Sequence, residues 1–387
     1  MFRYGHIALV LCTTLQACSS TDSDSRDRDE ATFPAMASTD LQHTLDDVVA
    51  AKVSPGVSVV VKRPGYSMWA GASGVANVLV GQSISTAQRF RAGSIMKVAV
   101  ATAVLQLVER GKLSLDAPLT EVLPTQVTER IVDAGSITLR MLLNHTSGIP
   151  DFADEAFHAK VGQAPTHVWS LEEQLELAYA MQPTGEPGAA FSYSNTNYVL
   201  LGEVLHRSTG KPWRQVLREN VFARVGLTAT SLPEPGNALC DGCARGYEPI
   251  DGALVDMTDV DASMGDASGG SGLITNPADL AKLIGALAEG KLFDDATTLD
   301  AMLGFIDAAI PEQAQTGYGL GLGRFQVGDA ELIGHIGGTA GYQSFVFFQP
   351  ASGAVVSGFM NCQGDFGAFV LPILDATARA LSGNTKH

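Results

Sequence analysis

Ser94 and Lys97 have the residue types and the spacing of a serine nucleophile and its base. Residues three apart on a helix lie on one face, so the hydroxyl and the amine can meet there. A serine is a weak nucleophile until a neighbour takes its proton, and a lysine can do so where burial and a helix N-terminus lower its pKa. The pair therefore predicts acyl transfer through a covalent intermediate on Ser94.

A second pair with the same spacing, Ser208 and Lys211, shows that spacing alone does not assign the nucleophile. Ser208 follows a predicted helix and is itself followed by a glycine and a proline, so we interpret it as a helix stop signal. Ser94 instead begins residues 94–110, a segment that is apolar nearly all round. A helix of that kind belongs in a protein interior, which favours Ser94 and Lys97 as the reactive pair.

Two further segments carry groups that suit the same chemistry. Tyr193 and Asn195 directly precede an apolar helix, a position that is equally typical of a helix-capping cluster. His335 closes a predicted strand and is followed closely by Gly337 and Gly338. Because glycines let a backbone N–H group approach a ligand closely, this strand end is a candidate substrate site.

Taken in chain order, these segments resemble the serine β-lactamase and penicillin-binding protein superfamily. The branch concerned holds class C β-lactamases, D,D-carboxypeptidases, D-aminopeptidases and related esterases. Each segment is modest alone, but five in order are specific, and they cover roughly residues 40–380. They are Ser94-x-x-Lys97, residues 142–149 (LLNHTSGI), Tyr193-x-Asn195, residues 269–275 with 278–280, and His335-x-Gly337.

The resemblance implies a role for each catalytic residue. Ser94 would attack a carbonyl and form an acyl-enzyme, while Lys97 and Tyr193 would share the general-base and general-acid work. Asn195 would orient the substrate amide or Lys97. The backbone N–H groups of Ser94 and Gly338 would bind the oxyanion, and such donors contribute several kcal/mol to transition-state stabilisation. No metal or cofactor is required.

One departure from the family pattern concerns the third motif, in which His335 would line the opposite wall of the site. Its middle position usually carries a threonine or serine that helps to bind a substrate carboxylate, but here it is Ile336. Arg324 is a candidate for binding that carboxylate instead, although a surface salt bridge is the commoner fate of such an arginine. Ile336 weakens a β-lactamase assignment and leaves peptidase, amidase and esterase activities open.

The order of the predicted elements indicates how these residues meet. An early strand, a helical middle and late strands predict an α/β (α+β) fold that the resemblance identifies as β-lactamase-like. We expect an antiparallel sheet built from both chain ends and flanked by helices, with a mainly helical lobe over roughly residues 113–270. The expected helices cover residues 41–51, 94–110, 138–143, 171–181, 197–207, 213–222, 277–288, 296–306 and 366–381, and the expected strands residues 56–62, 331–335, 342–349 and 354–361.

The N-terminus has the pattern of a lipoprotein signal. Arg3 precedes a short apolar run over residues 7–12, and the chain then reaches Leu15-Gln16-Ala17-Cys18, an ending that resembles the bacterial lipobox. We expect a signal peptide over residues 1–17, lipidation of Cys18, a flexible polar tether over residues 18–38 and a single catalytic domain over residues 39–387. By this resemblance the protein is anchored by lipid in the cell envelope, facing the periplasm, and Ser19 favours the outer membrane. An ordinary cleaved signal is the alternative.

Composition excludes several classes of function. The chain has 25 Lys+Arg against 41 Asp+Glu, a net charge of −16, and shows no basic cluster, so a nucleic-acid partner is not expected. Hydrophobic residues make up 45% of the sequence, enough for a large core.

Cys240 and Cys243 form a local disulfide or remain inert thiols, since no second pair completes a zinc site.

These observations predict an active-site serine hydrolase of the envelope, most closely a D,D-carboxypeptidase or D-amino-acid peptidase. A class C-like β-lactamase and a carboxylesterase are the enzymatic alternatives, and a non-catalytic penicillin-binding or scaffold lipoprotein is the alternative of another class. The substrate would be a D-amino-acid peptide, a β-lactam or an ester. No serine stands in G-x-S-x-G and no H-E-x-x-H occurs, which disfavours an α/β-hydrolase and a zinc hydrolase.

Overall fold

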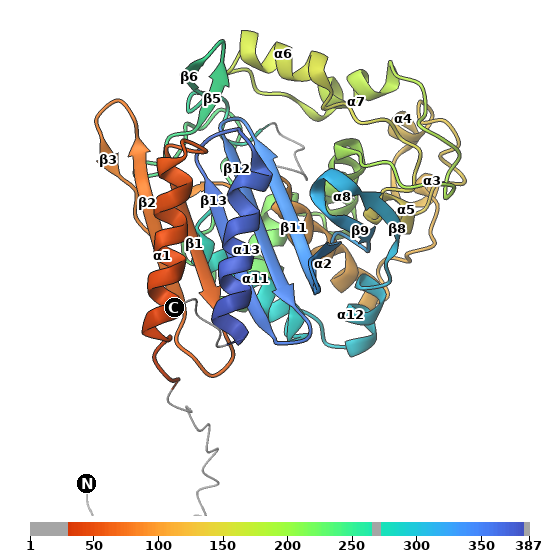
Figure 1. The fold of residues 1–387 in the computed structure, drawn as a ribbon. Coiled ribbons are helices and arrows are strands. Elements are labelled where there is room, and N and C mark those ends of the chain that lie inside the picture. Colours follow the sequence, from red (N-terminus) through yellow and green to blue (C-terminus); the bar gives the residue numbers. More distant parts are fainter. Residues whose placement is uncertain (1–29, 265–271, 383–387) are drawn as a thin grey trace, which may run out of the picture.

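The computed structural model describes residues 30–264 and 272–382 of the 387-residue chain, and a nine-stranded antiparallel sheet forms its centre (Figure 1). From one edge to the other the strands are β3 (Gln82–Ser83), β2 (Trp69–Asn77), β1 (Gly56–Lys62), β13 (Ala354–Met360), β12 (Tyr342–Gln349), β11 (Ala330–Thr339), β10 (Gly323–Val327), β9 (Gln315–Tyr318) and β8 (Ile306–Ile310). Strands from the two ends of the chain meet where β1 pairs with β13, so the expected sheet built from both chain ends is confirmed.

Helices cover both faces of this sheet. α1 (Ala35–Ala50) and α13 (Phe366–Ser382) lie together on one face, and α11 (Pro277–Ala288) packs against the other (Figure 1). Val57, Val59 and Val61 of β1 join the core under α1 and α13, whereas Val60 joins the core on the opposite face. Because successive strand residues point to opposite faces, the valine run of β1 fits a strand that is buried on both sides.

α2 (Met96–Glu109) lies in the interior, next to the helical lobe. Twelve of its fourteen residues are buried, which confirms the interior helix expected from its apolar surface. It follows the short turn η1 (Gly93–Ile95) and packs against α8 (Asn195–Thr209). Besides α11, the helices between α2 and the second half of the sheet are α3 (Leu119–Val122), α4 (Thr125–Thr128), α5 (Leu139–Leu143), α6 (Glu155–Gln163), α7 (Leu171–Tyr179), α8 (Asn195–Thr209), α9 (Trp213–Leu217), the π-helical turn η2 (Arg218–Phe222), α10 (Ala223–Val225) and α12 (Ala296–Met302).

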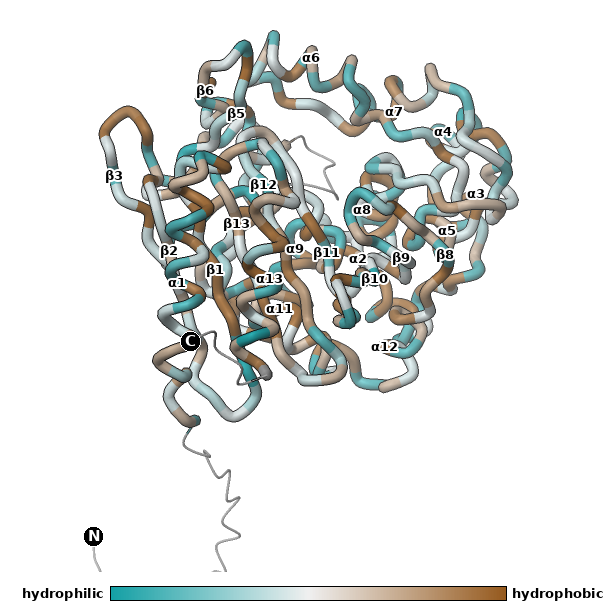
Figure 2. Tube along the Cα trace, in the orientation of Figure 1, coloured by the Kyte–Doolittle hydropathy of each residue, from teal (hydrophilic) through white to brown (hydrophobic). Residues whose placement is uncertain are grey.

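Small strand pairs and turns complete the described elements. They are β4 (Phe90–Arg91) with β7 (Ile274–Thr275), β5 (Tyr247–Ile250) with β6 (Ala253–Asp256), and the turn η3 (Pro311–Gln313). Figure 2 shows hydrophobic residues along β1 inside the sheet and again at the turn between β2 and β3, where Leu79 is 78% exposed. Within the described residues, no helix is both long enough and apolar enough to cross a membrane.

The start of the domain differs from the sequence prediction. The predicted signal peptide, Cys18 and the first part of the predicted tether lie outside the described residues. The tether does not reach residue 38, because Ala31 forms a bridge with Tyr66, Phe33 is buried and α1 begins at Ala35. Burial of Phe33 and Ala37 against the domain offsets the cost of ordering this segment, so the folded region begins before residue 39.

The bounds of several other elements agree with the sequence prediction, and those of others do not. β1, β12 and α11 have the predicted bounds, while the helix predicted over residues 296–306 ends at Met302, just before Gly304, and the chain then enters β8. The short strands β8, β9 and β10 and the helix α6 were not predicted, because they have little periodicity of their own. Cys240 and Cys243 form a disulfide, and Cys362 is a buried free thiol.

Candidate active site

Ser94 and Lys97 meet at the N-terminal end of the buried helix. Ser94 lies in η1, Lys97 is the second residue of α2, and the Lys97 Nζ atom is 3.1 Å from the Ser94 Oγ atom. Ser94 is half-buried and lines two cavities, so its hydroxyl is accessible to a substrate. The predicted pair therefore has the geometry of a nucleophile hydrogen-bonded to its base.

Burial controls the protonation of Lys97. Its side chain is completely buried, and this desolvation lowers the pKa of the amine to about 7, against the opposing effect of the nearby Asp151 carboxylate. A lysine with a pKa near 7 is neutral in about half of the molecules at neutral pH. Lys97 can thus take the proton of Ser94, which an ordinary lysine cannot do at this pH.

Tyr193 approaches the same serine from the helical lobe. It lies just before α8, its ring centroid is 4.9 Å from Lys97 Nζ, and its phenol hydrogen-bonds with Ser94. Burial raises the pKa of Tyr193 well above its usual value, although the hydrogen bond with Ser94 opposes this shift. The phenol stays protonated at neutral pH, so it is better suited to donate a proton than to accept one.

Asn195 connects Lys97 to a carboxylate that the sequence did not reveal. Its Oδ1 atom accepts a hydrogen bond from Lys97 Nζ at 2.7 Å, and its Nδ2 group donates to Asp151 Oδ2 at 2.9 Å. Of the two roles that the resemblance implied for Asn195, the structure shows the contact with Lys97. The only sequence signal for Asp151 is an acidic residue two positions after the end of the segment 142–149.

His145, inside that segment, packs behind Tyr193. It is completely buried, with its ring centroid 4.3 Å from that of Tyr193, and its Nδ1 atom accepts the backbone N–H of Ser194 at 3.1 Å. Burial, with the nearby Lys97 charge as a smaller contribution, holds the pKa of His145 well below its usual value. A neutral imidazole therefore supports the Tyr193 ring, a role that sequence reasoning missed.

The opposite wall is formed by β11. The Nδ1 group of His335 donates to the carbonyl of Ile336 at 2.5 Å, so its Nε2 atom accepts the Tyr318 hydroxyl at 2.9 Å. Burial, together with the charge of Lys97, lowers the pKa of His335 to about 3. His335 borders the cavity beside Tyr193 as a neutral group and carries no positive charge at neutral pH.

Close backbone packing brings β11 to the nucleophile. A Cβ atom on Gly337 would lie 2.1 Å from the Ala92 carbonyl oxygen, and one on Gly93 would lie 2.6 Å from the Gly338 carbonyl oxygen. Gly93 also has a φ of 54°, in the left-handed region that glycine favours. Gly338 is different, because the nearest atom to an added Cβ would be 3.8 Å away, and it borders the cavities. This packing brings Gly338 beside the turn that carries Ser94, as a shared oxyanion site requires.

Two cavities flank Ser94. The one beside Tyr193 has a volume of about 270 Å³ and is lined in part by Ile310, Gln313, Gln315 and Ile336. The one beside Asn195 is larger, about 670 Å³, and its lining includes Phe152, Phe157, Met257 and the carboxylate residue Glu248. The site can therefore hold groups on both sides of a scissile bond at Ser94.

The structure does not bring Arg324 to the serine. Its Nε group donates to Thr316 Oγ1 at 3.3 Å, and its guanidinium lies 5.3 Å from the ring centroid of Phe305. Arg324 is not among the residues that line either cavity at Ser94. The predicted substrate contact of Arg324 is therefore not supported, because its side chain is held elsewhere. Among the described residues, no three His, Cys, Asp or Glu side chains gather where they could hold a metal ion.

Comparison with known sequences identifies a family and several relatives of this chain. The sequence profile described as "Beta-lactamase" matches residues 41–379. A curated relative, "Penicillin-binding protein 4" of Amycolatopsis lactamdurans, is 28% identical over 306 residues, which cover 75% of this chain and 76% of the relative. "Esterase EstB" of Burkholderia gladioli is 31% identical over 195 residues, but these cover only 48% of this chain.

Solved structures with a similar fold include hydrolases of D-amino-acid derivatives. A D-stereospecific amidohydrolase from Streptomyces sp. has a TM-score of 0.78 and 30% identity, covering 88% of this chain and 98% of its own. The D-amino acid amidase from Ochrobactrum anthropi SV3, in complex with D-phenylalanine, has a TM-score of 0.78 and 29% identity, covering 90% and 99%. The match thus extends over nearly all of the described domain.

Proposed function

The chain belongs to the Beta-lactamase family and is a serine hydrolase, and from that premise we propose that it cleaves amide or peptide bonds of D-amino acids through an acyl-enzyme on Ser94. The observation that carries this proposal is the Ser94–Lys97 contact of 3.1 Å between two cavities of different chemistry. A nucleophile, a base and room for both halves of a substrate are thereby combined at one point.

The first step forms the acyl-enzyme. Neutral Lys97 accepts the Ser94 proton while Oγ bonds to the substrate carbonyl carbon, and the carbonyl π electrons move to oxygen as an oxyanion. The backbone N–H groups of Ser94 and Gly338 stabilise this charge, and one such donor contributes about 3–4 kcal/mol in a comparable site. Lys97 is left as an ammonium whose charge Asp151 partly compensates.

The second step releases the amine. The C–N bond breaks as the oxyanion collapses, and the leaving nitrogen takes the phenol proton of Tyr193. The Lys97 ammonium then returns its proton to Tyr193, so both groups recover their starting states. A water molecule hydrolyses the ester by the same route in reverse, giving the D-amino acid and free Ser94.

The two cavities indicate the substrate class. Because Tyr193 protonates the leaving nitrogen, the leaving group occupies the cavity on the Tyr193 side, whose uncharged lining suits ammonia or a small neutral amine. The acyl half then occupies the other cavity, where aromatic and methionine side chains suit an apolar substituent and Glu248 suits an α-ammonium group. A D-amino acid amide with a free amine combines these features. The names of two similar solved structures, a D-stereospecific amidohydrolase and a D-amino acid amidase, support this substrate class.

A substrate panel tests this proposal. Hydrolysis of D-phenylalaninamide, L-phenylalaninamide, an N-acylated D-Ala-D-Ala peptide, nitrocefin and p-nitrophenyl acetate is compared for the wild type and Ser94→Ala. We expect the D-amide to have the highest kcat/KM of the amides, with no turnover by Ser94→Ala. Turnover of the ester alone, a preference for the L-amide, or labelling of Ser94→Ala by a fluorophosphonate would contradict the proposal. A folded wild-type protein that fails to label would instead support a non-catalytic scaffold.

Glu248→Gln tests the acyl cavity separately. The variant loses the carboxylate but keeps an oxygen that can accept the N–H of Gly341, the contact seen at 3.2 Å. We expect KM for D-phenylalaninamide to rise about tenfold, while kcat/KM for p-nitrophenyl acetate, which has no ammonium, changes less than about twofold. An equal effect on both substrates would contradict an ammonium site at Glu248.

We also propose that the protein is a lipoprotein of the cell envelope, anchored through Cys18. The signal pattern of residues 1–18 supports this proposal, and the Cys240–Cys243 disulfide suits an oxidising compartment. Metabolic labelling with a radioactive fatty acid, followed by membrane fractionation, should detect the wild type and not Cys18→Ala. Equal soluble fractions for the two would contradict the anchor.

A further inference from the structure

Asp151 makes three hydrogen bonds, and two of them hold Asn195. Its Oδ1 atom accepts the backbone N–H groups of Asn195 at 3.0 Å and Ala153 at 3.1 Å, and its Oδ2 atom accepts the side-chain Nδ2 of Asn195 at 2.9 Å. Both oxygens of the carboxylate are therefore committed as acceptors.

This arrangement determines which way the Asn195 amide points. An amide side chain can be turned by 180° with little change in shape, so its hydrogen-bond partners decide where the oxygen lies. A carboxylate only accepts hydrogen bonds, and it must therefore face the NH₂ group of Asn195. The amide oxygen is then left to face Lys97 Nζ, where it accepts at 2.7 Å.

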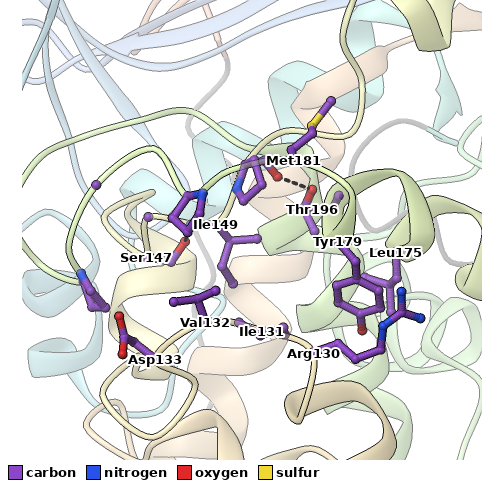
Figure 3. A pocket seen from close by; sticks show the side chains of 16 residues that line it. Arg130, Ile131, Val132, Asp133, Ser147, Ile149, Leu175, Tyr179, Met181 and Thr196 are labelled. Carbon is purple, nitrogen blue, oxygen red and sulfur yellow. Dashed lines mark hydrogen bonds between the residues drawn. The ribbon is translucent and has the colours of Figure 1, made fainter.

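The loop that carries Asp151 is itself fixed to α8. Thr196 Oγ1 donates to the carbonyl of Pro150 at 2.7 Å, and the same oxygen accepts the N–H of Phe152 at 3.1 Å. Ser147 Oγ donates to Asn197 Oδ1 at 2.7 Å. Figure 3 shows Ser147, Ile149 and Thr196 along the wall of a separate pocket, with the hydrogen bond of Thr196 dashed. Asp151 is thus held on both sides by contacts that do not involve Lys97.

We propose that Asp151 is a positioning residue for acylation, which orients Asn195 so that Lys97 presents its free electron pair to Ser94 and which supplies a fixed negative charge near Lys97. Without it, the amide of Asn195 can turn its NH₂ group toward Lys97 and draw the lone pair of the neutral amine away from the serine. The proposal rests on Ser94 as the nucleophile but not on the D-amino-acid substrate.

Other ionisable groups around Lys97 act differently. Those that face it come from four elements, namely His145 and Asp151 on the loop after α5, Tyr193 before α8, Tyr198 on α8, and His335 on β11. Burial lowers the pKa of both histidines and raises that of both tyrosines, so all four are neutral near pH 7. Asp151 is the one that raises the pKa of Lys97.

The test is the pH dependence of Ser94 labelling by a fluorophosphonate between pH 5 and 9 in Asp151→Asn. Above pH 8, where Lys97 is neutral in both proteins, we expect labelling to be about 10- to 100-fold slower, a part of the roughly 10²–10⁴-fold that positioned proton transfer supplies. The rate should decrease at low pH in both proteins, and we call this part of the profile the acid limb. The apparent pKa of the acid limb should be lower in Asp151→Asn, because the charge that raised the pKa of Lys97 is gone. An unchanged rate and acid limb would overturn the proposal.

A matched control and an exchange variant separate positioning from folding. Asp154→Asn removes an equal charge from the same loop and keeps an Asn cap for α6, so its labelling profile should match the wild type. In Asp151→Asn with Asn195→Asp, the amide donates to the carboxylate and the carboxylate faces Lys97, which restores the hydrogen bonds. We expect this double variant to be stable and to have an acid limb above that of the wild type. An acid limb at or below that of the wild type would overturn the proposal, and this comparison does not require the single variant to fold.

Discussion

The two walls of the active site hold Ser94 by different physical means. The helical-lobe wall is a network of side chains, in which Asp151, Asn195 and Lys97 are joined by hydrogen bonds of 2.9 and 2.7 Å. The β11 wall works through its backbone, because Gly337 and Gly93 allow main chains to approach where a Cβ atom would meet a carbonyl oxygen. The first wall sets protonation states, and the second sets where the carbonyl of the substrate can lie.

Substitutions in the two walls should therefore have different effects. Changes in the helical-lobe wall should mainly alter charge and proton transfer. Changes in the β11 wall alter the packing between the two lobes and hence stability. Ionisable groups are present on both sides, but His335 is neutral because burial and Lys97 lower its pKa to about 3. The titration that controls activity should therefore belong to Lys97 alone.

The largest expected effect comes from Lys97→Arg. An arginine remains protonated at every accessible pH, so the variant keeps the positive charge but cannot accept the Ser94 proton. We expect labelling of Ser94 by a fluorophosphonate at pH 8 to slow by about 10²–10⁴-fold. Labelling within tenfold of wild type by a folded variant would remove Lys97 from the proton transfer and place the base elsewhere.

Gly337→Ala should disturb the packing of the β11 wall. Its Cβ atom would lie 2.1 Å from the Ala92 carbonyl oxygen, so the strand or the turn before Ser94 must move. We expect a loss of about 1–3 kcal/mol of stability, measured by thermal or urea unfolding, together with reduced activity. Gly338→Ala is the matched control, since its Cβ has space, and should lower kcat/KM with little change in stability. Equal stability of the two variants would contradict the close approach at Gly337.

The pH profile of kcat/KM should show which wall contains the titrating group. Because the pKa of Lys97 is lowered to about 7, the amine is neutral above that pH, and kcat/KM should rise through pH 7 to a plateau. Below pH 7 we expect a fall of about tenfold per pH unit. His335→Gln should keep this limb at the same pH, because His335 does not titrate there. If the fall of kcat/KM below pH 7 disappeared in His335→Gln, the titrating group would belong to the β11 wall.

The smallest expected effect is that of Arg324→Ala. Its guanidinium packs over Phe305 and donates to Thr316, outside both cavities at Ser94. We expect kcat/KM to change by less than about twofold for every substrate tested, with a loss of about 0.5–1 kcal/mol of stability from the lost cation–π contact. A selective loss of activity on a substrate with a free carboxylate would restore the role suggested by the sequence.

The elements that sequence predicted best are those whose own residues carry the pattern. The valine run of β1 and the apolar face of α11 need no information about their partners, and their bounds agree with the structure. The start of α1 was misplaced, because the burial of Phe33 depends on contacts elsewhere in the domain. β9 and β10 are short and contain glycines, so only pairing within the sheet defines them.

The same distinction applies to the site. Ser94 and Lys97 could be found because a single helical turn joins them. Asp151 could not be found, because its partner Asn195 is 44 residues away and no local spacing connects them. The glycines of β11 could be named as a site where a backbone approaches a ligand, but that they face the turn of Ser94 depends on how β11 packs.

Sequence by itself determined that Ser94 and Lys97 lie one helical turn apart, the buried helix behind them, the sheet built from both chain ends and the excess of negative charge. Only the tertiary structure decided that Lys97 is suited to be the base and Tyr193 the acid, that the β11 histidine is neutral and that Arg324 lies apart. The physical reason is that pKa values and hydrogen bonds depend on burial and on distances of about 3 Å, which packing sets between residues far apart in the chain.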